Sequence, residues 1–149
     1  MTALSDDIGF LLSRVSGLVV RATNAALADE GLRVRQYSVL TLACDTAGGM
    51  SQRGLAAVLG LDPSQVVALV DELVDAGLVE RRPDPSDRRT RLVVATPAGR
   101  RKRKSAAVRA AAGMQDPLGP LSADEQATLR ALLSRVAAEA TLAVDRQEG

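Results

Sequence analysis

The sequence predicts a mainly α protein with a small β-hairpin, an α+β fold in one domain over residues 1–149. The first observation is composition: 46% of the residues are hydrophobic but only 1% are aromatic, so Leu, Val and Ala must build the core, which favours helices. The second is a series of helically spaced apolar stripes, each bounded by a capping residue and a glycine. The third is a pair of β-type segments around the turn PDPSD.

Two helices are expected before residue 50. The first runs from Ser5 to Asp29, with Ser5 as its N-cap and two aspartates in the first turn, where the helix dipole favours acids. Gly31 ends it. The second runs from Val34 to Ala43, and the segment TAGG closes it.

A compact pair of helices follows. The first, over 51–60, begins at a serine cap and ends at a glycine. One residue later Asp62 caps a second helix, predicted over Pro63–Ala76. Gln65 at its third position completes a capping box, and proline suits the first position of a helix. Gly77 ends this helix, so the pair forms a helix-turn-helix.

A hairpin and two further helices complete the chain. Leu78–Arg82 and Thr90–Thr96 are predicted strands, because the two prolines and two aspartates between them cannot continue a strand. Thr96 then caps a helix to Ala112, and Ser122 caps a last helix to Arg146. A helix-turn-helix followed by a hairpin is the winged-helix pattern.

The charge of the chain is unevenly distributed. The net charge is only +1, but ten basic and two acidic residues between Arg81 and Lys104 give that window +8, which leaves −7 for the rest. A concentrated basic region in a nearly neutral protein indicates a polyanion as partner.

The segment Met50–Gly99, which contains GLVERRPDPSDRR, LVVAT and PAG, resembles the MarR (multiple antibiotic resistance regulator) family, and the flanking helices fit as well. The resemblance implies a homodimer with dimerisation helices in 1–32 and 97–149 and a winged helix-turn-helix in 33–96. It also implies repression at an inverted-repeat operator in double-stranded DNA, often relieved by a small-molecule effector. No cofactor, metal or membrane is expected, and the cytoplasm is the expected location.

The helix after Asp62 is then the recognition helix, whose first residues meet base edges in the major groove. Gln can bond adenine through two hydrogen bonds, Ser adapts to several bases, and small apolar side chains can touch a thymine methyl. The residues predicted to contact DNA here are Pro63, Ser64, Gln65, Val67 and Ala68. Caps alone could also explain Ser64 and Gln65.

This helix departs from the family pattern at Ala68 and Glu72, where many members carry basic residues. Glu72 lies roughly 10 Å beyond Gln65 along the helix, so it can point away from phosphate. The departure implies that the wing, and not this helix, supplies most of the positive charge that attracts phosphate.

In the wing, Arg89 matches the family position that enters the minor groove, and Asp87 matches the acid that orients it. Two residues apart on a strand, they would share a face. Arg88 and Arg91 are predicted phosphate contacts, and so is Arg53 at the start of the preceding helix. A solvated arginine tip is the alternative.

For each of three further features, the sequence is consistent with two different roles. The run Arg100–Lys104 either faces phosphate or is a solvated helix face. Cys44 is either buried filler, the favoured interpretation, or a redox sensor. Arg14 and Tyr37 either line a ligand pocket or, as the favoured alternative, pack in the ordinary way.

Two other classes of function compete with a DNA-binding regulator. The first is a winged-helix protein-interaction module without DNA binding, and the +8 charge of the segment Arg81–Lys104 argues against it. An enzyme is disfavoured, because the chain has no histidine, one cysteine and no phosphate-binding glycine loop.

Overall fold

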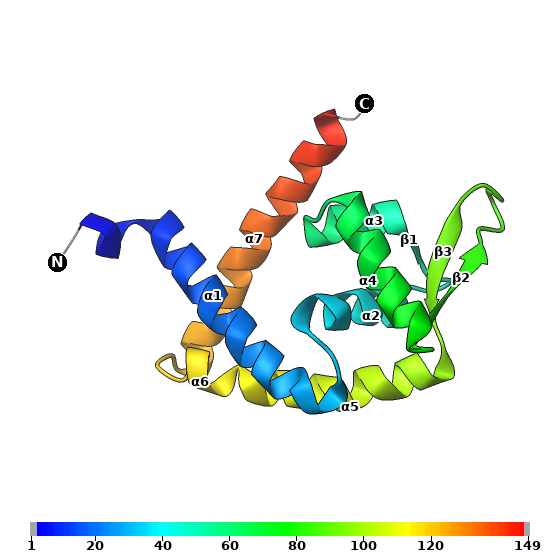
Figure 1. Ribbon diagram of the computed structural model, residues 1–149. Coiled ribbons are helices and arrows are strands. Elements are labelled where there is room, and N and C mark those ends of the chain that lie inside the picture. The colour runs from blue at the N-terminus through cyan, green and yellow to red at the C-terminus, as the bar shows by residue number, and fades with distance from the viewer. Residues whose placement is uncertain (1–2, 148–149) are drawn as a thin grey trace.

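The computed structural model describes residues 3–147, which form helices around a small antiparallel sheet (Figure 1). This agrees with the predicted α+β class. The helices are α1 (Ile8–Leu27), α2 (Val34–Asp45), α3 (Gln52–Leu59), α4 (Pro63–Asp75), α5 (Pro97–Gly113), α6 (Gln115–Leu118) and α7 (Ala123–Gln147), and the strands are β1 (Met50–Ser51), β2 (Val79–Pro83) and β3 (Arg91–Ala95). Two short 3₁₀ turns cover Ala3–Asp6 and Ala28–Glu30.

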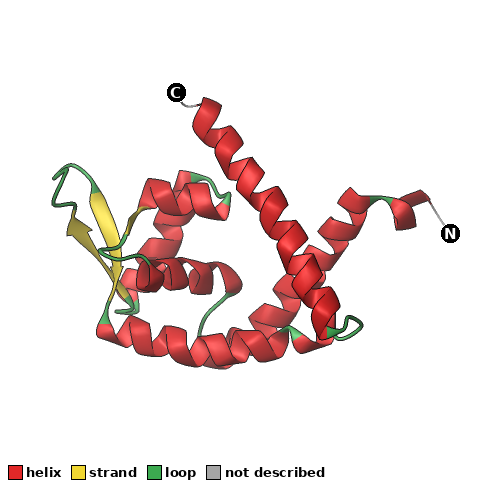
Figure 2. Cartoon of the chain, turned by 180° about the vertical axis from the view of Figure 1, so that it is seen from behind, coloured by secondary structure: helices red, strands yellow, loops and turns green. Residues whose placement is uncertain are grey.

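The elements gather at two ends of the molecule, and α5 runs between them. Figure 1 shows α1, α6 and α7 at one end and α2, α3, α4 and the sheet at the other. Figure 2 shows from behind that the N-terminal part of α1 and the C-terminal part of α7 extend away from the rest. The helix-turn-helix and hairpin thus lie to one side of the two long terminal helices, and they remain in contact with them through α1 on α2 and α7 on α3.

The N-terminal cap of the first helix was predicted wrongly. Asp7, not Ser5, is the N-cap of α1, and its Oδ1 accepts a hydrogen bond from Phe10 N at 2.6 Å. Ser5 lies in the preceding 3₁₀ turn instead. The helix also ends at Leu27, and a 3₁₀ turn leads to Gly31, whose φ of 68° is a left-handed conformation that glycine adopts readily.

The sheet has three strands, in the order β1-β3-β2, although only a hairpin was predicted. Strand β1 pairs Met50 with Val93 and Ser51 with Leu92. A strand of two residues is too short to show an alternation of apolar and polar side chains, so the sequence did not indicate it. It forms because its backbone pairs with the edge of β3. Gly49, at φ 90°, makes the approach feasible, since a Cβ there would lie 2.5 Å from Val93 O.

The core lies between the helix-turn-helix, the sheet and the middle of α5. The predicted stripe of α4 is buried, as are residues from α1, α2, α3 and both long strands. The largest fully buried side chains are Leu27, Val39, Leu40, Leu55, Val66, Val70, Leu73, Val79 and Val93. Aliphatic packing therefore fixes how α4 and the hairpin sit relative to each other.

No single helix among residues 3–147 is long and apolar enough to cross a membrane. Helices α3 and α4 together pass that test by length and composition, but they meet at 114°. Six of their side chains lie in the core of the chain.

Replacing Gly99 with alanine is expected to destabilise the fold by about 3 kcal/mol, because a close-packed joint cannot take an extra methyl group. Its Cβ would lie 1.9 Å from Leu78 O, where the hairpin meets α5. Denaturant unfolding measures the change. Gly17→Ala is the matched control: the nearest atom there is the flexible Arg21 Nη1 at 3.4 Å, so stability should stay equal or rise. Equal stability of the Gly99 variant would contradict the close approach.

Candidate nucleic-acid interface

The N-terminus of α4 is built as the sequence predicts. Asp62 is the N-cap, Pro63 is the first helical residue, and Gln65 Oε1 accepts a hydrogen bond from Asp62 N at 3.1 Å. The left-handed Gly60, at φ 62°, ends α3 and turns the chain into this cap. The start of the recognition helix is therefore set by local chemistry.

The two faces of α4 are chemically distinct. Val66, Leu69, Val70 and Leu73 are buried and hold the helix on the core. The five residues predicted to contact DNA, by contrast, are all exposed, and they are Pro63, Ser64, Gln65, Val67 and Ala68. The structure thus brings them together on one accessible face over the first turns of α4.

Gln65 caps the helix and is also predicted to contact a base. Its Oε1 is engaged in the cap, so its outward hydrogen-bonding group is the Nε2 amide donor. The predicted pairing with adenine needs both amide groups. Gln65 must therefore leave the cap to make that pairing, whereas it can donate to a base acceptor without moving.

The wing tip is a turn held by aspartates, and here one geometric prediction was wrong. Asp87 and Arg89 do not lie on a strand, because residues 84–90 connect β2 to β3. Asp87 Oδ1 accepts from the backbone N of Arg89 at 3.0 Å, and its Oδ2 accepts from the Thr90 hydroxyl at 3.2 Å. Asp87 thus positions Arg89 through its backbone rather than through its guanidinium.

Asp84 supports the other side of the tip. It accepts hydrogen bonds from the hydroxyl and the backbone N of Ser86, at 2.6 and 2.9 Å. These bonds hold the pKa of Asp84 below its usual range. Its backbone N also donates to Thr90 O at 2.9 Å, which closes the turn. The tip is therefore an ordered platform for its arginines.

The arginines of the hairpin fall into two groups. Arg88, Arg89 and Arg91 are exposed and form no ion pair among residues 3–147. Arg82 pairs with Glu80 on its own strand. Free positive charge is therefore concentrated at the tip.

Arg81 has a structural role that the sequence alone did not indicate. Its Nη2 contacts Asp71 Oδ1 of α4 at 2.5 Å, and its Nε donates to Gln52 Oε1 of α3 at 3.0 Å. Arg81 therefore ties the wing to both helices of the helix-turn-helix. Asp71, an exposed acid between the buried Val70 and Leu73 of α4, was the signal that could have indicated it.

The second half of the basic window lies away from the tip. Strand β3 separates the two halves, and its five residues span about 15 Å. Three of the five cations in Arg100–Lys104 have partners within the chain. Arg100 donates to Cys44 O at 3.3 Å, Lys102 pairs with Glu30 at 3.4 Å, and Arg103 pairs with Asp45 at 3.0 Å.

These contacts attach α5 to the end of α2 and to the turn after α1. They supply a structural reason for a basic run that sequence reasoning left open. Arg101 and Lys104 stay exposed, with no ion pair among the described residues. The +8 window is therefore divided between the tip of the hairpin and the first turns of α5, which lie at opposite ends of β3 (Figure 1).

Cys44 packs against the core at the end of α2 and is half-buried. Burial raises the pKa of its thiol, which disfavours the reactive thiolate. This supports the favoured interpretation of Cys44 as filler. Among the described residues, no three His, Cys, Asp or Glu side chains are grouped to hold a metal ion.

Arg53 is the second residue of α3 and is exposed. It has an interaction partner within the chain, so a contact with phosphate would share its guanidinium.

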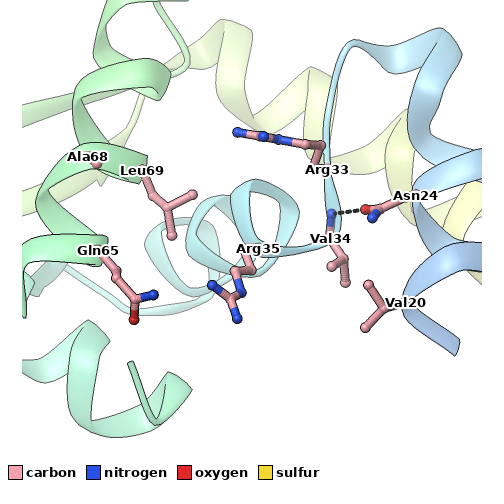
Figure 3. A pocket seen from close by; sticks show the side chains of 8 residues that line it. All are labelled: Val20, Asn24, Arg33, Val34, Arg35, Gln65, Ala68 and Leu69. Atoms are coloured by element: carbon pink, nitrogen blue, oxygen red, sulfur yellow. Dashed lines mark hydrogen bonds between the residues drawn. The ribbon is translucent and has the colours of Figure 1, made fainter. Parts of the chain in front are cut away.

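A pocket of about 410 Å³ lies between α1, α2 and α4 (Figure 3). Two arginines and an apolar wall face it, and its lining is Val20, Asn24, Arg33, Val34, Arg35, Gln65, Ala68 and Leu69. Arg14 and Tyr37 are not among these residues. Arg14 is exposed on α1 and Tyr37 packs against the core, so their part in ligand binding stays a prediction.

A capped helix with an outward reading face, next to an arginine-tipped hairpin, defines a winged-helix protein. A family model described as MarR family matches residues 30–90. The multiple antibiotic resistance protein MarR of Salmonella typhimurium is 31% identical over 87% of this chain and 90% of that protein. The chain therefore belongs to the MarR family of transcriptional regulators, and it is not an enzyme.

Two solved structures are similar over most of their length. CouR from Rhodococcus jostii RHA1, bound to p-coumaroyl-CoA, is 53% identical, with a TM-score of 0.83 over 92% of this chain and 96% of that one. A MarR-family transcriptional regulator from Rhodococcus sp. RHA1 is 51% identical, with a TM-score of 0.84 over 92% and 98%. These likenesses support the fold independently of the sequence motifs.

Proposed function

We propose that this protein is a dimeric repressor in the cytoplasm that binds an inverted repeat in double-stranded DNA. Two features of the structure together carry the proposal. The first turns of α4 are exposed, and Arg88, Arg89 and Arg91 of the hairpin form no ion pair among residues 3–147. The helix face suits the major groove and the arginine tip suits the adjacent minor groove and backbone.

The distribution of charge suggests different roles for α4 and for the wing. The exposed face of α4 offers the Gln65 amide, the Ser64 hydroxyl and two small apolar side chains, but no cation. Base reading is therefore assigned to α4. Arg89 is assigned to the minor groove, whose negative potential attracts guanidinium, and Arg88 and Arg91 are assigned to phosphates.

Dimerisation is assigned to α1 and α7. An exposed apolar stripe follows each helix, in positions that the rest of the chain leaves uncovered: Ile8, Leu11, Leu12, Val15 and Leu18 on α1, and Leu132, Leu133 and Val136 on α7. A contiguous apolar surface of this kind marks a protein interface. A two-fold dimer would present two recognition helices to two half-sites of an inverted repeat.

A ligand response is assigned to the pocket between α1, α2 and α4. It touches the first helix, which belongs to the proposed dimer interface, and the recognition helix. CouR was solved with p-coumaroyl-CoA. At 53% identity, an aromatic acyl-CoA is the first ligand to test, since Arg33 and Arg35 can meet its phosphates and the apolar wall its ring.

The test is footprinting and gel retardation with DNA beside the gene that holds an inverted repeat. We expect protection of both half-sites and a log–log salt dependence with a slope of about −4 or steeper, because Arg88 and Arg91 of two protomers would release phosphate counterions. Scrambled duplex of equal length is the control. A protein that retards no duplex at low salt would instead be a winged-helix interaction module.

A further inference from the structure

Glu72, the acidic residue on the recognition helix, is held by two side chains from the start of α2. Arg33 Nη2 contacts Glu72 Oε2 at 3.2 Å, and Gln36 Nε2 donates to the same oxygen. Both partners lie more than 30 positions away in the sequence. The carboxylate of Glu72 is therefore neutralised by a contact between α2 and α4.

The start of α2 is also bonded to α1. Asn24 Oδ1 accepts from Val34 N at 2.8 Å, and Gln36 Oε1 accepts from Arg33 N at 2.9 Å. A continuous series of hydrogen bonds thus runs from α1 through the first turn of α2 to Glu72 on α4. Figure 3 shows Asn24, Val34 and Arg33 of this series around the pocket.

We propose that Arg33 is a positioning residue that is shared between two partners: it holds Glu72 when the pocket is empty and an anionic ligand when the pocket is filled. Loss of Arg33 leaves the Glu72 carboxylate bonded to Gln36 alone, without a compensating positive charge, and weakens DNA binding. This inference rests on the proposed function, because it supplies the link between that pocket and DNA release.

The geometry makes an exchange of partners feasible. The side chains of Arg33 and Glu72 are 64% and 44% exposed, and an exposed ion pair contributes little to stability, so another anion can replace it. The pocket is lined by Arg33 and Arg35 but by no carboxylate. An anion with an apolar part, such as a carboxylate or phosphate joined to a ring, matches this lining.

The position of Glu72 explains why its release would matter. Glu72 lies seven residues beyond Gln65, two helical turns along the same side of α4 and roughly 10 Å away. A carboxylate without its cation on that side of the helix repels the phosphates of bound DNA. Roughly 10 Å is a little more than one Debye length at physiological salt, so this repulsion is moderate there and strongest at low salt. Glu72 paired with Arg33 is thus part of a DNA-compatible helix that carries no cation on its reading face.

A double-mutant cycle on operator affinity tests the positioning role. We expect Arg33→Gln to weaken operator binding about three- to ten-fold, Glu72→Gln to leave it within about two-fold of wild type, and the double variant to return to that level. The deficit of Arg33→Gln should shrink as salt rises. All these side chains are exposed or half-buried, and thermal melting checks that each variant folds.

Arg35→Gln is the matched control, since Arg35 lines the same pocket but forms no ion pair with Glu72. Glu72→Gln should not rescue any loss in that variant. If Arg33→Gln binds like wild type, or if the double variant stays as weak as Arg33→Gln, the positioning role is overturned. Wild-type protein that binds no operator would instead refute the proposed function.

The competition is tested with p-coumaroyl-CoA as probe. It should release wild-type protein from the operator, whereas Glu72→Gln should bind the probe more tightly and lose less DNA affinity, because the competing carboxylate and its repulsion are absent. The ratio of operator dissociation constants with and without probe measures this. An equal ratio for both proteins, or no binding of the probe to wild type, would overturn the competition.

Discussion

Replacing Arg89 with alanine is expected to weaken operator binding about 10- to 100-fold without changing the stability of the fold. The side chain is exposed at the wing tip and has no ion pair among the residues that the structure describes, so the variant removes none of their ion pairs. The complex of the variant with DNA would lack the contact between the Arg89 guanidinium and the minor groove, whose potential is most negative over narrow A·T tracts. Gel retardation at one fixed salt concentration measures the loss.

Arg101→Ala is the control for charge alone. It removes the same group from an exposed arginine on α5, beyond the end of the hairpin opposite the tip, which has no ion pair among residues 3–147. It should change the dissociation constant by less than about two-fold. A second control replaces the A·T pairs beneath the wing with G·C pairs, which should reduce the effect of the Arg89 variant. Equal losses for both arginines would show that net charge, and not the wing tip, drives binding.

Replacing Leu12 with glutamate is expected to convert the dimer to monomers and to weaken operator binding by more than about 100-fold. Leu12 lies in the middle of the exposed stripe of α1, so each dimer would bury two unpaired carboxylates at its interface. A monomer reads one half-site and loses the affinity that two linked recognition helices provide. Sedimentation velocity gives the mass, and gel retardation gives the affinity.

Val58→Glu is the matched control, since Val58 is an exposed apolar residue on α3, outside the proposed interface. That variant should sediment as wild type does. A monomeric wild-type protein, or a dimeric Leu12 variant with unchanged operator affinity, would contradict the assignment of dimerisation to α1.

Much of the local structure of the proposed DNA-facing surface could be predicted because its signals are local. The cap of α4 depends on residues three positions apart, and Gln65 bonds Asp62 as expected. Ser122 and Glu125 cap α7 in the same reciprocal way, at 2.8 and 3.2 Å. The apolar spacing of α4 likewise predicted its buried stripe and hence its exposed face.

The failures share a different cause. Asp87 was placed on a strand because strand ends depend on pairing between distant segments, and the pairs of β2 and β3 end at Pro83 and Arg91. Strand β1 was missed for the same reason. Ser5 was a plausible cap by residue type, but Asp7 takes the position where the helix begins.

The sequence by itself determined the order of elements, the helix caps, the outward residues of the recognition helix and the arginine-rich wing, because these follow from contacts within a few positions. Only the tertiary structure decided which charges are free. Arg81, Lys102 and Arg103 find acids 10 to 72 positions away, while Arg89 finds none among the described residues. A charge pattern shows where cations occur, but folding brings some of them to acidic partners and leaves others, such as Arg89, available for the proposed contact with DNA.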